Sequence, residues 1–154
     1  KYPIDSTIVV EELEGANTFN RFVVNIKDTG TMAVYAVHTT SPVTKEYFNR
    51  RNLQMEKLAK LLNAEEEQLV IAAGDYNLTP WSYYYHQFLD NVNDRYHNAS
   101  GIGGVKFSWE ANFAPISAAH IDHAFVSEAI KVVDYELLSI PGSDHKAQLI
   151  TIGL

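Results

Sequence analysis

The sequence has no cysteine, few basic residues and no long apolar run. Without cysteine the chain can form no disulfide, no thiolate metal site and no cysteine nucleophile. The 12 Lys and Arg residues stand against 19 Asp and Glu residues, a formal net charge of −7. This balance argues against a protein that coats nucleic acid by neutralising phosphates. No stretch reaches the ~18 apolar residues that a membrane-spanning helix needs, so we predict no membrane contact from this segment.

The composition that remains is that of an ordinary folded protein, with 46% hydrophobic and 20% charged residues. We therefore expect one domain over residues 1–154 with a sizeable core. Hydrophobic periodicity and turn residues predict a mostly β chain with one long and one short helix. Strands are expected at 6–12, 20–27, 31–40, 69–73, 106–110, 120–127, 129–139 and 146–152, helices at 44–62 and 82–89, and irregular segments at 13–19, 91–105 and 111–119. This order predicts an α+β fold of the layered α/β sandwich type.

The most informative stretch begins with the apolar run 69–73, which is typical of a strand buried on both faces. Gly74 follows and permits a turn or a close backbone approach. If the chain remains extended there, Asp75 and Asn77 project from the same face. A carboxylate and an amide at the end of a buried strand occupy the place where open α/β sheets bind ligands.

Two local features concern the helices. Thr79 and Pro80 fit the N-cap and the first position of a helix. The first half of the longer helix is polar, and we interpret this part as a solvated face. It comprises Arg50, Arg51, Asn52 and Gln54.

Polar residues interrupt the ends of four predicted strands, where an unpaired buried charge would be costly. They are His38, then Asp75 with Asn77, then Asp122, then Asp144 with His145. Carboxylate, amide and imidazole groups without thiols suit Mg²⁺ or Mn²⁺. A serine hydrolase built on Ser143, Asp144 and His145 is the alternative, but the G-x-S-x-G turn that such enzymes use is missing.

Three short motifs occur in the order found in a known superfamily. They are Gly74-Asp75-Tyr76-Asn77, Ile121-Asp122-His123 and Gly142-Ser143-Asp144-His145. Together they resemble the C-terminal motifs of the endonuclease/exonuclease/phosphatase superfamily, the DNase I-like metal-dependent phosphoesterases. The longer segment 74–82, with 51–54 upstream, resembles a bacterial subgroup whose full-length members often carry membrane helices before the catalytic domain.

The resemblance implies hydrolysis of phosphoester bonds, with a role for each matching residue. Asp75 would orient or deprotonate the attacking water, and Asn77 would hold that water or a phosphoryl oxygen. His145, paired with Asp122, would stabilise charge on the phosphoryl group in the transition state. His38 resembles the family's phosphate-contacting histidine and would contact phosphate or assist the leaving group.

The resemblance also implies a divalent cation, Mg²⁺ or Mn²⁺, bound by Asp144 with help from Asp75 and Asn77. The family's domain is a two-sheet sandwich flanked by helices, and this chain matches only its C-terminal portion. The family's metal-binding glutamate belongs to an earlier strand, and no matching motif precedes His38. We therefore expect the principal metal ligand to be missing and the isolated segment to be nearly inactive.

The implied partner is a phosphate-ester substrate, which in relatives with these motifs is DNA, RNA, a phospholipid head group or an inositol phosphate. An alternative is a non-catalytic module that binds a phosphorylated ligand or partner on the same scaffold. Half of a sandwich would leave apolar sheet surface uncovered, and such surfaces tend to associate. We therefore expect a homo-oligomer formed through an exposed sheet face.

Overall fold

The computed structural model describes residues 3–10, 19–101, 106–110 and 118–153 of the chain. Ten strands and two helices lie in these described residues. In chain order they are β1 (Ile4–Val10), β2 (Phe19–Ile26), β3 (Gly30–His38), α1 (Lys45–Asn63), β4 (Leu69–Asp75), α2 (Tyr83–Asn91), β5 (Tyr96–Asn98), β6 (Trp109–Glu110), β7 (Ala118–Ala119), β8 (Asp122–Ser127), β9 (Lys131–Ser139) and β10 (Lys146–Gly153). Neither helix is long and apolar enough to cross a membrane.

Six of the strands form the main sheet, in the order β1-β2-β3-β4-β8-β5. Neighbouring strands are antiparallel except β3 and β4, which run parallel and are joined through α1. In this register His38 at the end of β3 lies opposite Asp75 at the end of β4. Asp75 in turn lies opposite Asp122, the first residue of β8. The topology alone thus gathers three of the predicted site residues at one edge of the sheet.

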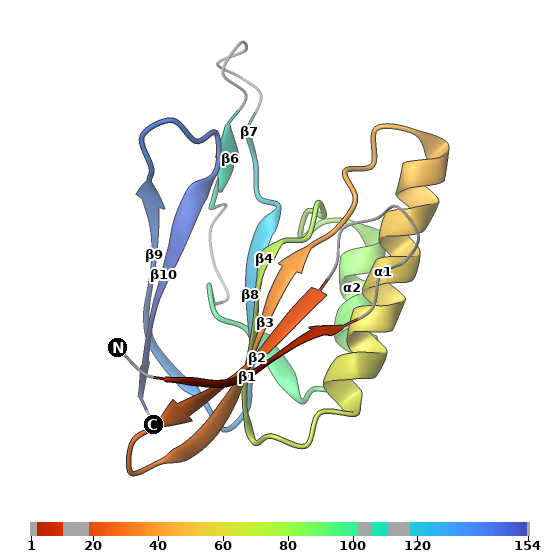
Figure 1. Cartoon of the computed structure of the whole chain (residues 1–154). Helices are drawn as coiled ribbons and strands as arrows, with labels where there is room; N and C mark the ends of the chain where they lie inside the picture. Colours follow the sequence, from red (N-terminus) through yellow and green to blue (C-terminus); the bar gives the residue numbers. More distant parts are fainter. Residues whose placement is uncertain (1–2, 11–18, 102–105, 111–117, 154) are drawn as a thin grey trace.

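Figure 1 shows three layers, with α1 and α2 on one face of the main sheet and the β9–β10 hairpin on the other. Helix α1 was predicted to begin at Thr44, and in the structure Thr44 is its N-cap, whose side chain accepts a hydrogen bond from the Tyr47 N–H. Its apolar stripe includes Leu58 and Leu62, which are fully buried in the core between the helices and the sheet. Phe88 of α2 packs into the same core.

The core on the hairpin side is smaller. Ala124 and Val126 of β8 are fully buried there, whereas Ile150 and Ile152 of the hairpin are only partly buried. The strand at 69–73 is accordingly enclosed on its helix face and only partly covered on its hairpin face. The prediction of a strand buried on both faces therefore holds fully for one face.

Local structure departs from the predictions at several points. The segment 91–105 was expected to be irregular, but β5 lies within it and pairs with β8. Helix α2 is capped by Ser82, whose side chain accepts a hydrogen bond from the Tyr84 N–H, so the prediction of a cap at Thr79 is wrong. The predicted strands 106–110, 120–127 and 129–139 begin two or three residues later than expected. Residues 11–18 and 111–117 lie outside the described residues, and so do the predictions made for them.

Candidate active site

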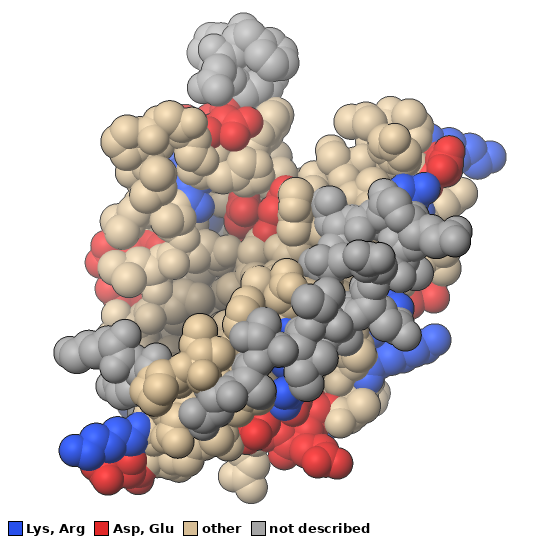
Figure 2. Space-filling view, in the orientation of Figure 1, with Lys and Arg blue, Asp and Glu red and all other residues tan. Residues whose placement is uncertain are grey.

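A cleft of about 430 Å³ lies where β3, β4 and β8 present the predicted site residues. His38, Asp75, Asn77 and His145 line it together with Trp109. Figure 2 shows acidic atoms inside the hollow between the helical side and the hairpin side of the molecule. Four residues predicted from separate parts of the sequence therefore share one cleft.

Asp75 and Asn77 form a closed pair. The backbone N–H of Asn77 donates to Asp75 Oδ1 over 2.7 Å, and Asn77 Nδ2 donates to Asp75 Oδ2 over 2.9 Å. Asn77 has a positive φ of 48°, so the chain is not extended here as the i, i+2 argument assumed. Asparagine tolerates this left-handed conformation better than most residues. The turn fixes both side chains in one place more firmly than an extended strand would.

Asp122 and His145 form the second pair of the cleft. His145 Nδ1 lies 3.0 and 3.2 Å from the two carboxylate oxygens of Asp122. Asp122 is 6% exposed, and its backbone N–H donates to Ser108 Oγ. Because Nδ1 of His145 faces the carboxylate, Nε2 is the nitrogen left for a ligand. This arrangement orients an imidazole by a buried carboxylate.

The surroundings of Asp75 raise the pKa of its carboxyl group. Burial raises the pKa of Asp75, and the nearby Asp122 carboxylate raises it further. The Asn77 N–H, His145 and His38 oppose this rise. A carboxyl group whose pKa is raised by burial and a like charge is a candidate general base.

His38 stands at the open side of the cleft. Its side chain is 64% exposed, and its Nε2 lies 3.9 Å from Asp75 Oδ2. This exposure leaves the imidazole able to reach a group that enters from solvent.

Asp144 is placed differently from the other predicted residues. Its Oδ2 accepts a hydrogen bond from the Trp109 indole N–H over 3.0 Å, and it is not among the described residues that line the cleft. Within the described residues, no group of three His, Cys, Asp or Glu side chains is placed to hold a metal ion. The donors are oxygen atoms of the right kind for Mg²⁺, but the described set does not complete a cation site.

The polar residues in the first half of α1 contradict the prediction of a solvated face. Arg51, Asn52 and Gln54 are 3%, 8% and 0% exposed. Arg51 Nη1 donates to the Asn77 carbonyl over 2.6 Å, and Gln54 Oε1 accepts from the Thr40 N–H over 2.8 Å. Arg51 thus supports the loop that follows β4, and Gln54 supports the loop that follows β3.

A sequence signal could have revealed this burial. Arg51, Met55, Leu58 and Leu62 follow the i, i+4, i+7, i+11 spacing of one helix face. Arg51 therefore falls on the apolar stripe that faces the sheet, despite its charge.

Two further residues, His123 and Gly74, fix the backbone next to Asp75 and Asn77. His123 is 1% exposed, and its Nε2 lies 2.7 Å from the Leu78 carbonyl, in the loop after Asn77. Burial lowers the pKa of His123 to about 4, so this ring is neutral at pH 7 and donates its N–H to that carbonyl. Gly74 has a φ of +144°, and a Cβ there would lie 1.9 Å from the Val37 carbonyl oxygen. Only glycine allows β4 this close approach to β3 beside Asp75.

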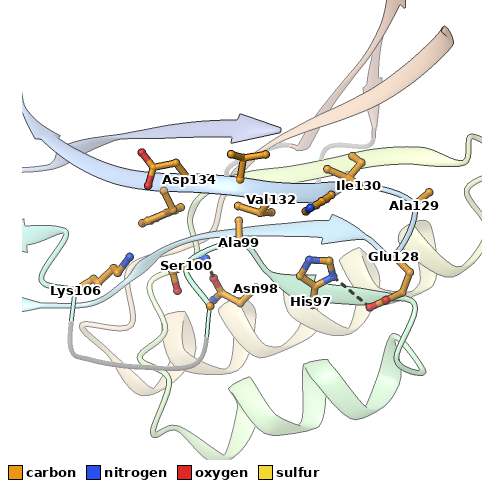
Figure 3. Close-up of a pocket in the computed structure, with 14 residues that line it drawn as sticks. His97, Asn98, Ala99, Ser100, Lys106, Glu128, Ala129, Ile130, Val132 and Asp134 are labelled. Atoms are coloured by element: carbon orange, nitrogen blue, oxygen red, sulfur yellow. Dashed lines mark hydrogen bonds and ion pairs between the residues drawn. The ribbon is translucent and has the colours of Figure 1, made fainter. Parts of the chain in front are cut away.

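A second cavity of about 670 Å³ lies between β5 and β9 (Figure 3). Its lining includes Lys106 and Lys131, and an ion pair of 3.2 Å between His97 and Glu128. None of the predicted site residues lines it. The candidate site is therefore identified by the residues that line the smaller cleft and not by the size of the cavity.

The sequence model of the Endonuclease/Exonuclease/phosphatase family matches residues 1–145. A search of curated proteins found no match. Among solved structures, the endonuclease/exonuclease/phosphatase from Beutenbergia cavernae DSM 12333 is 20% identical, with a TM-score of 0.72 over 99% of this chain and 46% of that chain. Humanized D. rerio TDP2 with 14 mutations is 15% identical, with a TM-score of 0.76 over 99% and 68%. The endonuclease/exonuclease/phosphatase from Bacteroides vulgatus is 19% identical, with a TM-score of 0.71 over 100% and 67%.

At these identities the similarity to solved structures shows the fold. It is the DNase I-like α+β fold that the motifs predicted. The chain spans less than half the length of the Beutenbergia cavernae protein and about two thirds of the other two. Since the family model covers nearly the whole sequence, the chain belongs to the Endonuclease/Exonuclease/phosphatase family, within a superfamily of phosphoesterases and nucleases.

Proposed function

We propose that this chain supplies the phosphate-handling part of a divalent-metal-dependent phosphoester hydrolase, of the phosphodiesterase, nuclease or phosphatase type. The observation that supports this most strongly is the convergence of two pairs on one cleft, Asp75 with Asn77 and Asp122 with His145. Phosphoryl transfer needs positioning and charge stabilisation more than covalent chemistry. These two pairs are suited to both tasks.

The proposed roles follow from the contacts. Asp75, with its raised pKa, accepts a proton from the attacking water. Asn77, fixed against Asp75, holds that water or a phosphoryl oxygen. His145, oriented by Asp122 through Nδ1, presents Nε2 to the phosphoryl oxygens as negative charge develops. His38 contacts phosphate or assists the leaving group from the open side.

The family is generally dependent on divalent metals, and we propose Mg²⁺ or Mn²⁺ as the cofactor. Such an ion supplies charge neutralisation and Lewis acidity. Asp75, Asn77 and Asp144 are the donors we propose from this chain. Because the described residues form no cluster of three ligands, we propose that a glutamate elsewhere in the whole protein completes the site. The 154-residue chain by itself should then bind Mg²⁺ poorly.

A non-catalytic module that binds a phosphorylated ligand is the second candidate. The incomplete cation site is the observation that favours it. Such a module would bind phosphate in the same cleft without turnover and without a requirement for metal. An Asn-bearing strand and a Glu-bearing strand in the whole protein would favour the enzyme.

The test is Mg²⁺-dependent activity of the whole protein on a panel of phosphate esters, which includes DNA, RNA, phospholipid head groups and inositol phosphates. We expect turnover of at least one class and its loss in Asp75→Ala. Unchanged activity in Asp75→Ala would overturn the site assignment. Robust turnover of bis-p-nitrophenyl phosphate by the 154-residue chain would overturn the incomplete site.

We also propose that residues 1–154 form one domain that self-associates through its incompletely covered sheets. Val133, Leu138 and Leu149 of the hairpin are 61%, 41% and 49% exposed. Apolar side chains of this size on one two-stranded sheet favour association. Light scattering should give a mass of at least two copies, and a monodisperse monomer would contradict this.

A further inference from the structure

The first half of α1 places a buried cation behind the candidate active site. Arg51 is 3% exposed, and burying a guanidinium is costly unless it is paired and hydrogen-bonded. Among the described residues, Arg51 has no carboxylate partner, whereas the neighbouring Arg50 pairs with Glu46 on the surface. Burial also lowers the pKa of the Arg51 guanidinium.

The contacts of Arg51 show where the charge is directed. Its Nη1 donates to the Asn77 carbonyl over 2.6 Å, and its Nε donates to Asn52 Oδ1 over 2.8 Å. The guanidinium carbon lies 5.1 and 5.8 Å from the ring centroids of Phe48 and Tyr84, which hold its flat faces. The planar group is therefore fixed in orientation, with one edge on the backbone of Asn77.

Asn77 is consequently held on both sides. Its N–H and its Nδ2 donate to the two oxygens of Asp75, and Nδ2 also donates to the Thr39 carbonyl over 2.9 Å. Its own carbonyl is held by Arg51. A non-glycine residue at a positive φ stays there only when its surroundings fix it. The bond from Arg51 is the contact that joins this turn to the rigid helix.

The cleft itself lacks a permanent positive charge. No Lys or Arg is among the described residues that line it, while Asp75 and Asp122 face each other across neighbouring strands. An anionic phosphate ester entering such a site meets the carboxylate of Asp75, with the buried carboxylate of Asp122 next to it. The guanidinium of Arg51, hydrogen-bonded to the carbonyl of Asn77, is a buried positive charge held next to a residue that lines this cleft.

We propose that Arg51 is a positioning residue that fixes the Asn77 turn against Asp75 and places a permanent positive charge behind the phosphate-binding cleft. This assignment rests on the proposed phosphoesterase function for its effect on turnover. Its effect on the geometry of Asn77 stands independently of that function.

The test compares Arg51→Met and Arg51→Lys with Arg50→Met, a matched control one residue away whose side chain is partly exposed and pairs with Glu46. Lysine keeps the charge but lacks the rigid planar group through which Nε and Nη1 donate to Asn52 and Asn77. Two quantities are measured on the whole protein: amide hydrogen exchange at Asn77 by NMR, relative to amides in β4, and the kcat and KM for the best ester substrate.

We expect Arg51→Met to speed exchange at Asn77 at least 10-fold relative to β4, and to lower kcat about 100-fold because the turn is misplaced. KM should rise by less than about 3-fold, because Arg51 does not line the cleft and its charge acts on bound phosphate only from behind Asn77. Arg51→Lys should lie between Arg51→Met and the wild type in both quantities. Arg50→Met should match the wild type.

Unchanged relative exchange at Asn77 in Arg51→Met would overturn the assignment, and so would equal effects of Arg51→Met and Arg50→Met. If Arg51→Met does not fold, Arg51→Lys decides, because wild-type exchange and kcat in that variant would show that the guanidinium is not needed. If the wild-type protein hydrolyses no ester, the proposed function fails. Amide hydrogen exchange at Asn77 then still tests whether Arg51 fixes the Asn77 turn.

Discussion

Two carboxylates that border β4 differ in how their charge is balanced. Glu65, in the segment before β4, accepts hydrogen bonds from Arg21 Nε and Nη2 over 2.7 and 2.8 Å and from the Tyr35 hydroxyl over 2.6 Å. Burial raises the pKa of Glu65, but these hydrogen bonds outweigh burial and lower it to about 2. At the other end of the strand, Asp75 has a second carboxylate as its neighbour, and its pKa is raised.

The difference separates a structural cluster from a functional one. The oxygens of both residues accept hydrogen bonds, but the charge of Glu65 is also matched by Arg21, as in a stabilising ion pair. Asp75 keeps a charge that the fold does not neutralise, which is expected where a substrate or cation completes the balance. Burial alone does not separate them by function, because the side chain of Glu65, 3% exposed, is more buried than that of Asp75, 16% exposed.

The largest effect should come from Asp75→Asn, which removes the proposed base and keeps its shape. Turnover by the whole protein should fall about 10³-fold, the range typical of a lost general base. Thermal unfolding should shift far less than in Glu65→Gln. Asp90→Asn on the exposed side of α2 is the matched control and should retain wild-type turnover. Equal turnover in Asp75→Asn and Asp90→Asn would show that Asp75 is not a catalytic residue.

Glu65→Gln should show the opposite behaviour. Breaking a buried ion pair leaves Arg21 without its partner and should lower the free energy of unfolding by about 3 kcal/mol. Urea denaturation measures this loss, and turnover under conditions where the variant is folded should match the wild type. Glu66→Gln, at an exposed neighbouring position, should stay within about 0.5 kcal/mol of wild type. A similarly small change for Glu65→Gln would mean that the two clusters do not differ.

The pH dependence of stability sharpens the same contrast. The pKa of Glu65 is lowered from 4.5 to about 2 in the folded state, so its ionised form stabilises the fold. This contribution is fully present above pH 4.5 and is lost as the pH falls through 2. The gap in unfolding free energy between wild type and Glu65→Gln should therefore shrink over that window. A gap that is constant with pH would show that ionisation of Glu65 is not its source.

The smallest effect should come from Tyr35→Phe, which removes one of several donors to Glu65. We expect a loss of about 1 kcal/mol in the free energy of unfolding, the usual net value of one hydrogen bond. Tyr47→Phe on the exposed side of α1 serves as control. A loss in Tyr35→Phe as large as that in Glu65→Gln would show that the hydroxyl, and not Arg21, holds the carboxylate.

Much of the fold and of the site could be predicted because the signals were local. The apolar stripe of α1 predicts that helix without any knowledge of the sheet, and the structure adds its N-cap at Thr44. Motifs at strand ends predict that Asp75, Asp122 and His145 come together, and the structure pairs Asp122 with His145, which lines the same cleft as Asp75. Their catalytic roles stay predictions. Asn77 is predicted as a site residue from its spacing to Asp75 and its motif, whereas its left-handed φ of 48° is seen only in the structure.

What sequence reasoning missed depends on tertiary contacts. Strand β5 has three residues, Tyr96–Asn98, and exists because β8 offers it an edge to pair with. The burial of Arg51 and Gln54 depends on the loops after β3 and β4, which supply the carbonyl and the N–H that these side chains bind. A polar residue on an apolar stripe is ambiguous until its partner from elsewhere in the chain is known.

The most direct test of the central claim is to titrate the isotope-labelled chain with inorganic phosphate and to map the perturbed residues by NMR. Phosphate should perturb the resonances of His38, Asn77 and His145. It should bind Asp75→Asn at least as tightly as Asp90→Asn, because Asp75→Asn removes a negative charge from the cleft. Perturbations confined to the cavity of Figure 3, at Lys106 and Lys131, would contradict the account, as would none at the cleft.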